Sequence, residues 1–247
     1  MVLSVVAPSG ANLFAQSTTQ PVEPPAAEAV GEKGKPLDVL ATAKKLATTT
    51  YAGWTYGNGE QDGTKVIDCT CFIAAVCKQL ARESGKPLTG AQTAAIKIAN
   101  LTDKEKAGLA KLVAEGDRKI RGVVTALVDA GLGKAVEPED ARAGDLVQYW
   151  YHAKGDAKNW LGHAAIVESI DKGKATLFGS HKSTLRQRAD GKDQLEGNDK
   201  VDVSKGGIGS GPEFDLTDAS RKVWVVRWTA TAAEASAPAK RKAPAKD

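Results

Sequence analysis

The stretch GHAAIVESIDKGKATLFGSH, residues 162–181, decides the fold of the second half of this chain. It has the pattern of two strands joined at Asp171-Lys172-Gly173, which has the form of a three-residue turn with glycine in the left-handed position. Counting outward from that turn places His163 opposite His181 on adjacent antiparallel strands. Both imidazoles are then expected on one face of the sheet, within reach of each other.

The predicted face of these two histidines also carries small and apolar side chains, which suit packing beneath a helix: Ala165, Val167, Ala175 and Leu177. Further strands are predicted over residues 146–151 and 223–229. Residues 182–218 are predicted to form a long polar, glycine-rich connection.

Helices are predicted upstream of the strands. The first runs from Pro36 to about residue 47, the second follows Asp68 as its N-cap to about residue 80, and the third covers residues 120–128. Helices followed by strands predict an α+β layered fold with an antiparallel sheet.

Length and composition describe one globular domain with extensions, because 247 residues with 42% hydrophobic and 26% charged residues can bury a sizeable core. Residues 1–35 are interpreted as a flexible N-terminal arm, residues 36–230 as the domain, and residues 231–247 as a flexible basic tail. The four basic residues of the tail are interpreted as solvated charges; adhesion to an anionic wall or membrane surface is the alternative.

The net charge of +4 is too small to indicate a nucleic-acid partner, and no segment is apolar enough to span a membrane. The N-terminus has no basic residue before its short apolar stretch, so it is a poor secretory signal; a processed or truncated signal is the alternative. Together with unpaired thiols, this pattern indicates synthesis in the cytoplasm.

The three cysteines, Cys69, Cys71 and Cys77, are too close together to form a disulfide framework. Cys69 directly follows the predicted N-cap, where free backbone N–H groups are expected to lower a thiol pKa and to hold an oxyanion. Cys71 and Cys77 are interpreted as buried apolar residues. A zinc site is not expected, because Cys-x-Cys in a helix directs its sulfurs apart and no second pair has ligand spacing.

These residues form motifs that resemble those of the NlpC-type cell-wall peptidases, a papain-like family. DCTCFIAAV (68–76) resembles their Asp-Cys-Ser-Gly-Phe motif, and GWTYG (53–57) their Gly-x-Pro-Tyr element. AGDLVQYW (143–150) resembles their Pro-Gly-Asp-Leu-Val strand, and GHAAIV (162–167) their Gly-His-Val-Gly-Ile strand. His181 stands where the family has a third polar residue.

The resemblance covers about residues 37–228 and implies a papain-like domain, in which the helix carrying the nucleophile packs on an antiparallel sheet. It implies Cys69 as nucleophile, His163 as base, His181 as the residue that orients the base, and Tyr56 as an oxyanion donor; the alternative for Tyr56 is an ordinary loop residue. The sequence departs from the family at Cys71, which replaces a glycine, and in two longer segments, residues 101–133 and 156–160.

The implied activity is hydrolysis of an amide bond in peptidoglycan stem peptides through an acyl-enzyme, with no metal or organic cofactor. Its expected substrate is peptidoglycan or a peptide, and its expected site of action is the cell wall. Delivery machinery and an immunity protein are expected partners if the chain is an injected toxin; a phage component is the other expectation. The alternatives are a thiol acyltransferase on the same scaffold and an inactive wall-binding module.

Overall fold

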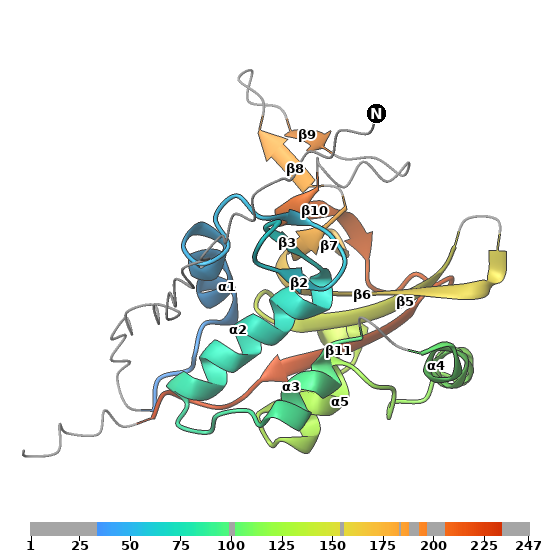
Figure 1. Ribbon diagram of the computed structural model, residues 1–247. Helices are drawn as coiled ribbons and strands as arrows, with labels where there is room; N and C mark the ends of the chain where they lie inside the picture. Colours follow the sequence, from blue (N-terminus) through green and yellow to red (C-terminus); the bar gives the residue numbers. More distant parts are fainter. Residues whose placement is uncertain are drawn as a thin grey trace, which may run out of the picture.

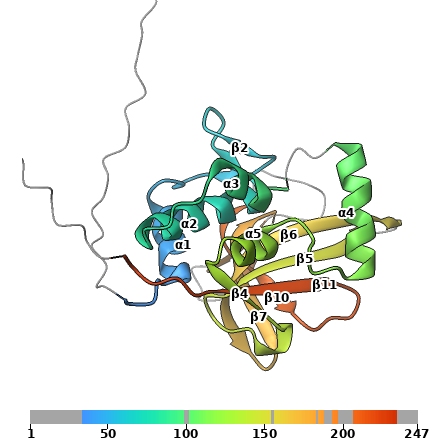
Figure 2. The same cartoon turned by 90° about the horizontal axis from the view of Figure 1, so that it is seen from below.

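The chain forms an α+β fold in which helices pack on a large, curled mixed sheet (Figure 1, Figure 2). A computed structural model describes residues 34–98, 102–153, 156–182, 184–187, 193–196 and 206–233. The predicted α+β class is therefore confirmed. Most of both predicted terminal extensions lies outside the described residues.

The helices are α1 (Val39–Thr48), α2 (Cys69–Glu83), α3 (Gly90–Ile96), α4 (Asp103–Glu115) and α5 (Val123–Asp129), with a 3-10 turn η1 at Pro138–Asp140. The first, second and third predicted helices correspond to α1, α2 and α5. The first begins later than predicted, because the Asp38 carboxylate accepts the Ala41 N–H as N-cap while Pro36 pairs with Thr231. Sequence reasoning missed α3 and α4, although each has a threonine–glutamine or threonine–glutamate capping box.

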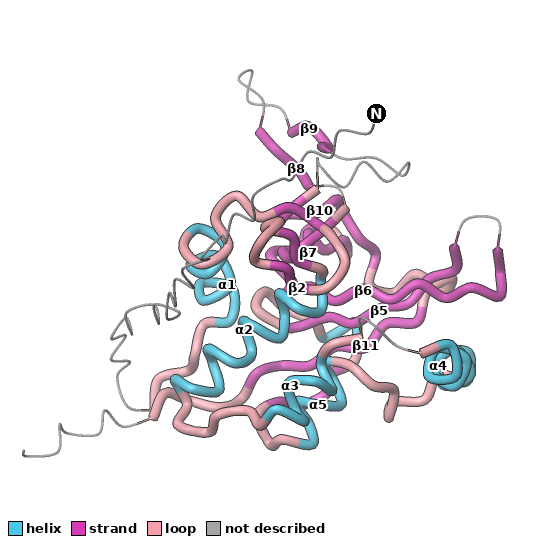
Figure 3. The backbone as a smooth tube through the Cα atoms, viewed as in Figure 1, coloured by secondary structure: helices cyan, strands magenta, loops and turns pink. Residues whose placement is uncertain are grey.

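The main sheet has nine strands in the order β2-β3-β1-β10-β7-β6-β5-β11-β4, and β8 and β9 form a separate pair (Figure 3). Their bounds are β1 (Thr55–Tyr56), β2 (Glu60–Gln61), β3 (Val66–Ile67), β4 (Gly133–Val136), β5 (Leu146–Ala153), β6 (Asp156–Asp171), β7 (Lys174–His181), β8 (Thr184–Gln187), β9 (Asp193–Glu196), β10 (Gly207–Asp215) and β11 (Lys222–Trp228). The prediction of a purely antiparallel sheet is wrong at one edge, because β1 and β3 are parallel.

A second correction concerns residues 182–218, which were predicted to form only a connection. They contain β10, which lies inside the sheet between β1 and β7. Its sequence, GIGSGPEFD, has few of the β-branched and aromatic residues that mark strands, so the position of β10 comes from pairing with its neighbours. Residues 156–160, which resemble an insertion, extend β6 at its N-terminal end.

The sheet separates two apolar clusters. Side chains of Ala164, Ile166 and Phe178 belong to the large core that includes α2. The predicted set of Ala165, Val167, Ala175 and Leu177 lies in a smaller cluster formed with residues of β5, β10 and β11. The prediction that this set packs beneath the cysteine helix is therefore wrong, because successive residues of a strand point to opposite faces.

The β6–β7 turn also differs from its prediction. Asp171 pairs with Lys174, so the turn has two residues, with φ angles of 49° at Lys172 and 80° at Gly173. The additional residue of β6 is instead Glu168, in a bulge beyond which Val167 pairs with Leu177. Because the bulge adds the residue that the shorter turn omits, the register beyond it is the one that sequence counting predicted.

Residues at the two ends of the described domain pair with each other. Gly34 N–H donates to Ala232 O at 3.3 Å, and Ala232 N–H donates to Lys35 O at 3.0 Å. Ala233 N–H donates to Glu83 O at the end of α2, at 2.9 Å. The folded unit therefore includes residues 34–35 and 231–233, a few residues beyond the predicted bounds of 36–230.

Candidate active site

Asp68 fixes the start of α2 and the loop before it. Its Oδ1 accepts the Cys71 N–H at 2.7 Å and the Thr70 hydroxyl at 2.8 Å. Its Oδ2 accepts the Gly59 N–H at 2.9 Å. All these bonds hold backbone and side chains in place, which agrees with the structural role predicted for this N-cap.

Cys69 is the first residue of α2, and its side chain is almost closed to solvent, with 5% of the residue exposed. Burial, followed by the charge of Asp68, raises the pKa of the Cys69 thiol to about 12. Backbone N–H groups of Ala164, Thr70 and Cys69 itself oppose this rise in pKa. The predicted lowering of the thiol pKa is therefore wrong for this closed site, because desolvation outweighs the helix terminus.

The Ala164 N–H reaches the sulfur because β6 and β7 separate at this point. Val167 exchanges backbone hydrogen bonds with the segment beside β5, donating to Asp145 O and accepting from Gly144 N–H, both at 2.8 Å. By strand alternation, Ala164 turns its N–H the other way, toward β7. The β6–β7 pairing ends at Ile166, so Cys69 lies beside the opening between these strands.

His163 and His181 contact each other from adjacent antiparallel strands, as sequence counting predicted. His163 Nε2 lies 3.0 Å from His181 Nδ1, and the ring centroids are 4.9 Å apart. Both residues are buried, with 9% and 6% of their surfaces exposed. Burial lowers both pKa values, that of His181 to about 4 and that of His163 well below its ordinary range.

The His181 ring lies in a cradle of backbone. Its Nε2 is 3.1 Å from Leu177 O, four residues earlier in β7. A side chain on Gly179 or Gly211 would meet the ring: the position of a Cβ atom is 3.5 Å from His181 Nε2 for Gly179 and 3.1 Å from Cε1 for Gly211. Gly211 therefore leaves the space in which the imidazole folds back toward the Leu177 carbonyl, whereas a Cβ at residue 179 would be in ordinary contact with the ring.

The two contacts of His181 determine where the hydrogens lie. A carbonyl oxygen only accepts, so His181 Nε2 carries a hydrogen and donates it to Leu177 O. In a neutral imidazole the other nitrogen is then bare, so His181 Nδ1 accepts the Nε2–H of His163. This leaves His163 Nδ1 unprotonated and able to accept a proton.

Two tyrosines, Tyr56 and Tyr149, lie within electrostatic range of Cys69. Tyr56 is half-buried, and burial, followed by the charge that a Cys69 thiolate would carry, raises the pKa of its hydroxyl. Tyr149 pairs with His163 across β5 and β6, and their ring centroids are 5.3 Å apart. Burial, then Tyr151 and Cys69, raises the pKa of Tyr149 as well. Both hydroxyls therefore stay protonated and can act as hydrogen-bond donors.

Sequence reasoning selected Cys69, His163, His181 and Tyr56. The structure brings His163 and His181 into contact, places the Cys69 thiol against the backbone N–H of Ala164, the residue after His163, and places Tyr56 within electrostatic range of Cys69. Sequence reasoning missed Tyr149, the Leu177 carbonyl, Gly179 and Gly211. Tyr149 had a usable signal, since it alternates with Val147 on β5, but only the β5–β6 register places it opposite His163.

The third histidine, His152, lies away from the His163–His181 pair, and the other two cysteines are buried. The His152 ring contacts that of Trp160 in a tilted arrangement with centroids 3.7 Å apart, far along the β5–β6 extension. Cys71 and Cys77 are free and buried, as predicted, and the Cys71 thiol donates to Asp68 Oδ2 at 3.5 Å.

Within the described ranges, no three His, Cys, Asp or Glu side chains are grouped to hold a metal ion. No helix in the described part of the chain is long and apolar enough to cross a membrane.

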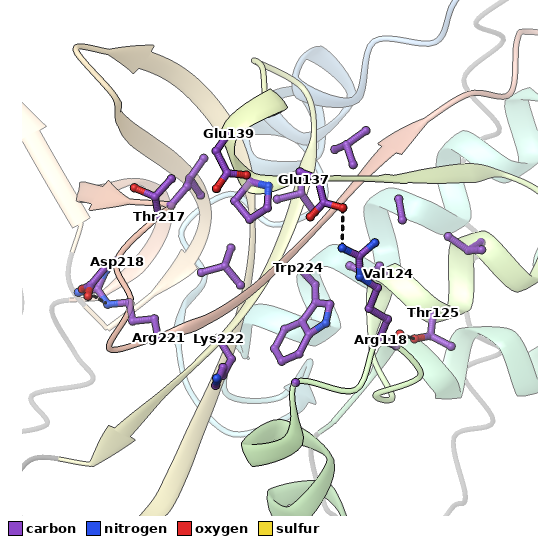
Figure 4. A pocket seen from close by; sticks show the side chains of 18 of the residues that line it. Arg118, Val124, Thr125, Glu137, Glu139, Thr217, Asp218, Arg221, Lys222 and Trp224 are labelled. Atoms are coloured by element: carbon purple, nitrogen blue, oxygen red, sulfur yellow. Dashed lines mark hydrogen bonds and ion pairs between the residues drawn. The ribbon is translucent and has the colours of Figure 1, made fainter.

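A cavity of about 480 Å³ lies away from Cys69, between β4, α5, β11 and the turn before β11 (Figure 4). Trp224 lies centrally in it, and the Arg118–Glu137 and Arg221–Asp218 ion pairs lie around it. None of the predicted site residues lines this cavity, so it is not where the thiol would react.

Comparisons of the chain with protein-family models, with curated proteins and with solved structures found no match. The resemblance to NlpC-type peptidases therefore rests on the motifs quoted above.

Proposed function

We propose that this chain is a cysteine hydrolase with a papain-like domain, related to the NlpC-type peptidases, that cleaves an amide bond in peptidoglycan stem peptides. The observation that carries the proposal is the directed hydrogen-bond chain from Leu177 O through His181 to His163, on the strand beside Cys69. A thiol, a base and a group that orients the base are what nucleophilic catalysis requires.

The reaction starts from a neutral thiol and a neutral imidazole, because burial disfavours both charged forms. The Cys69 proton passes to His163 Nδ1 as the sulfur attacks the substrate carbonyl, and a C–S bond forms. His163 then protonates the leaving amine as the C–N bond breaks, which leaves a thioester on Cys69. Water, deprotonated by His163, attacks the thioester and releases the acid and the thiol.

The negative oxygen of the tetrahedral intermediates would be met by donors already in place. Backbone N–H groups at the start of α2 point toward the sulfur, and the Tyr56 hydroxyl stays protonated. Preorganised donors of this kind are most effective where water is excluded. Tyr56 is therefore proposed as an oxyanion donor rather than an ordinary loop residue.

Acyl transfer is a second candidate, and the burial of Cys69, His163 and His181 favours it. A site that excludes water protects a thioester from hydrolysis and lets another acceptor take the acyl group. The inactive wall-binding module has less support, because a binding surface has no need of a complete proton path to a buried thiol.

Incubation with purified peptidoglycan, followed by mass spectrometry of the soluble fragments, tests the proposal. Hydrolysis releases stem peptides with new carboxylates, and Cys69→Ser should release far less. Cys77→Ala is the matched control, since Cys77 is a buried thiol on the same helix. Adding a small amine identifies a transferase by an amide product. Absence of both products from the wild-type protein would contradict the proposed activity.

A further inference from the structure

One bulge lies on each side of Leu177, the first in β6 and the second in β10. On the β6 side, pairing shifts between Val167↔Leu177 and Ser169↔Thr176, with Glu168 as the additional residue. On the β10 side, pairing shifts between Ser210↔Phe178 and Glu213↔Thr176, so residues 211–212 stand opposite Leu177 alone. A strand that is flanked by bulges loses its regular ladder and bends at that point.

The bend explains how Leu177 O reaches a side chain four residues away. In a straight strand, residues four apart are separated by about 13 Å, which is too far for a histidine ring to cover alone. Here the distance from Leu177 O to His181 Nε2 is 3.1 Å. The irregular backbone beside Leu177 and the missing side chain of Gly211 together allow this contact.

One side chain connects the two bulges. Glu168 accepts the Ser210 hydroxyl through Oε2, and its Oε1 lies 2.7 Å from Lys44 Nζ of α1. Its side chain is only 18% exposed. A Cβ on Gly211, the residue after Ser210, would lie 3.1 Å from the His181 ring, so the bulge of β6 is connected through Ser210 to the backbone beside the imidazole.

We propose that Glu168 is a positioning residue of this site, which joins the two bulges and thereby holds the Leu177 carbonyl where it sets the tautomer of His181. We refer to Glu168, together with the Ser210 and Lys44 side chains that it contacts, as the brace. Lys44 also lies 5.8 Å from the ring centroid of Phe178, which packs in the helix-side core, whereas Leu177 belongs to the opposite cluster. The brace thus links α1 to the backbone on both sides of Leu177.

This inference deepens the proposed function and rests on it for its catalytic meaning, but its structural content is measured without substrate. NMR of the histidine ring nitrogens reports which nitrogen carries hydrogen. In the wild-type protein near neutral pH, His181 should show a protonated Nε2 and a bare Nδ1, and His163 a protonated Nε2. The reverse arrangement at His181 would overturn the proposal.

Glu168→Ala should replace the two distinct His181 nitrogen signals by averaged ones, because Leu177 O is no longer held. Glu168→Gln keeps an oxygen for the Ser210 hydroxyl and should lie between Glu168→Ala and the wild type. Glu213→Ala is the matched control: Glu213 also borders the β10 bulge, but its side chain is 67% exposed and pairs with Lys174 at 3.6 Å instead of with the brace residues. It should leave the histidine signals unchanged.

The outcomes separate the two proposals. Unchanged histidine signals in a folded Glu168→Ala protein would refute the role of Glu168, whatever the activity. If Glu168→Ala does not fold, unchanged signals in Glu168→Gln and Ser210→Ala serve as the refuting result. Correct wild-type tautomers without release or transfer of any peptidoglycan product would refute the proposed function alone.

Discussion

His163 Nε2 lies 3.0 Å from His181 Nδ1, and this contact determines which ring nitrogen of His163 carries the hydrogen. Because His181 gives its only hydrogen to Leu177 O, it must accept from His163. His163 Nδ1 is therefore the basic nitrogen of the pair.

Substitution of each histidine should have a different effect on turnover. His163→Ala removes the proton acceptor and should lower turnover by roughly 10²–10⁴-fold. His181→Ala should cost less, because an unoriented imidazole still accepts a proton part of the time. His181→Asn or His181→Gln should retain more than alanine, since the amide oxygen accepts from His163 and the amide nitrogen can donate to Leu177 O. Initial rates of peptidoglycan release measure this, and equal rates for His163→Ala and wild type would refute the mechanism.

Gly211→Ala should disturb the site, whereas Gly179→Ala should not. A Cβ at residue 211 would lie 3.1–3.3 Å from three ring atoms of His181, so the ring must move by a few tenths of an ångström. A Cβ at residue 179 would lie in ordinary contact at 3.5 Å. Since misplacement by 1 Å costs about 100-fold, Gly211→Ala should lose roughly tenfold in rate. A greater loss in Gly179→Ala than in Gly211→Ala would contradict the conclusion that Gly211 is the glycine that leaves space for the His181 ring.

The thiols should react slowly with iodoacetamide in the native protein near neutral pH. Burial raises the pKa of Cys69 and of Cys71 to about 12, and that of Cys77 as well, so little thiolate is present. A rise of this size reduces the thiolate fraction by roughly three orders of magnitude relative to the unfolded chain.

Mass spectrometry of alkylated peptides, with and without denaturant, compares these rates. Cys69 should be the first thiol labelled in the native state, because it lies at the sheet opening, and Cys77, which is fully buried, should be the last. Labelling of Cys77 before Cys69 in the native state would contradict this order of reactivity.

The free energy of unfolding should fall as the pH is lowered from about 6.5 to about 4. The pKa of His181 is lowered to about 4 in the folded protein, so in this window the unfolded chain binds the proton that the folded chain excludes. The stabilisation is complete above pH 6.5, and its loss by pH 4 amounts to on the order of 3 kcal/mol. Denaturant unfolding of wild type and His181→Gln at several pH values measures it, and identical pH profiles would contradict the buried neutral imidazole.

Shortening the chain to residues 34–233 should preserve the melting temperature, whereas shortening it to residues 37–230 should lower it. The shorter chain loses the three backbone hydrogen bonds that Gly34, Ala232 and Ala233 donate. At about 0.5–1.5 kcal/mol each, their loss should lower the melting temperature by several degrees. Calorimetry of both chains tests this, and equal melting temperatures would mean that these contacts contribute little.

Local signals in the sequence were sufficient for the site elements. Asp68 marks the start of α2 because a carboxylate before a helix satisfies N–H groups that have no partner within it. The His163–His181 contact followed from counting residues. It survived an error in the turn because the number of unpaired residues between the two histidines is three in either arrangement: a three-residue turn, or a two-residue turn with one bulge residue in β6. What matters is that number, and a bulge or a longer turn can supply it equally well.

Long-range pairing decided the rest. Strand β10 has too few strand-forming residues to be recognised alone, yet it lies between β1 and β7 and supplies Gly211. The thiol pKa depends on how much water the assembled sheet and helices exclude, which no local pattern reports. The sequence by itself was sufficient to predict the candidate site residues Cys69, His163 and His181 and the elements that carry them, α2 and the β6–β7 hairpin. Only the tertiary structure decided that Leu177 O orients His181, because a backbone carbonyl has no side-chain signature and is placed by strands distant in the chain.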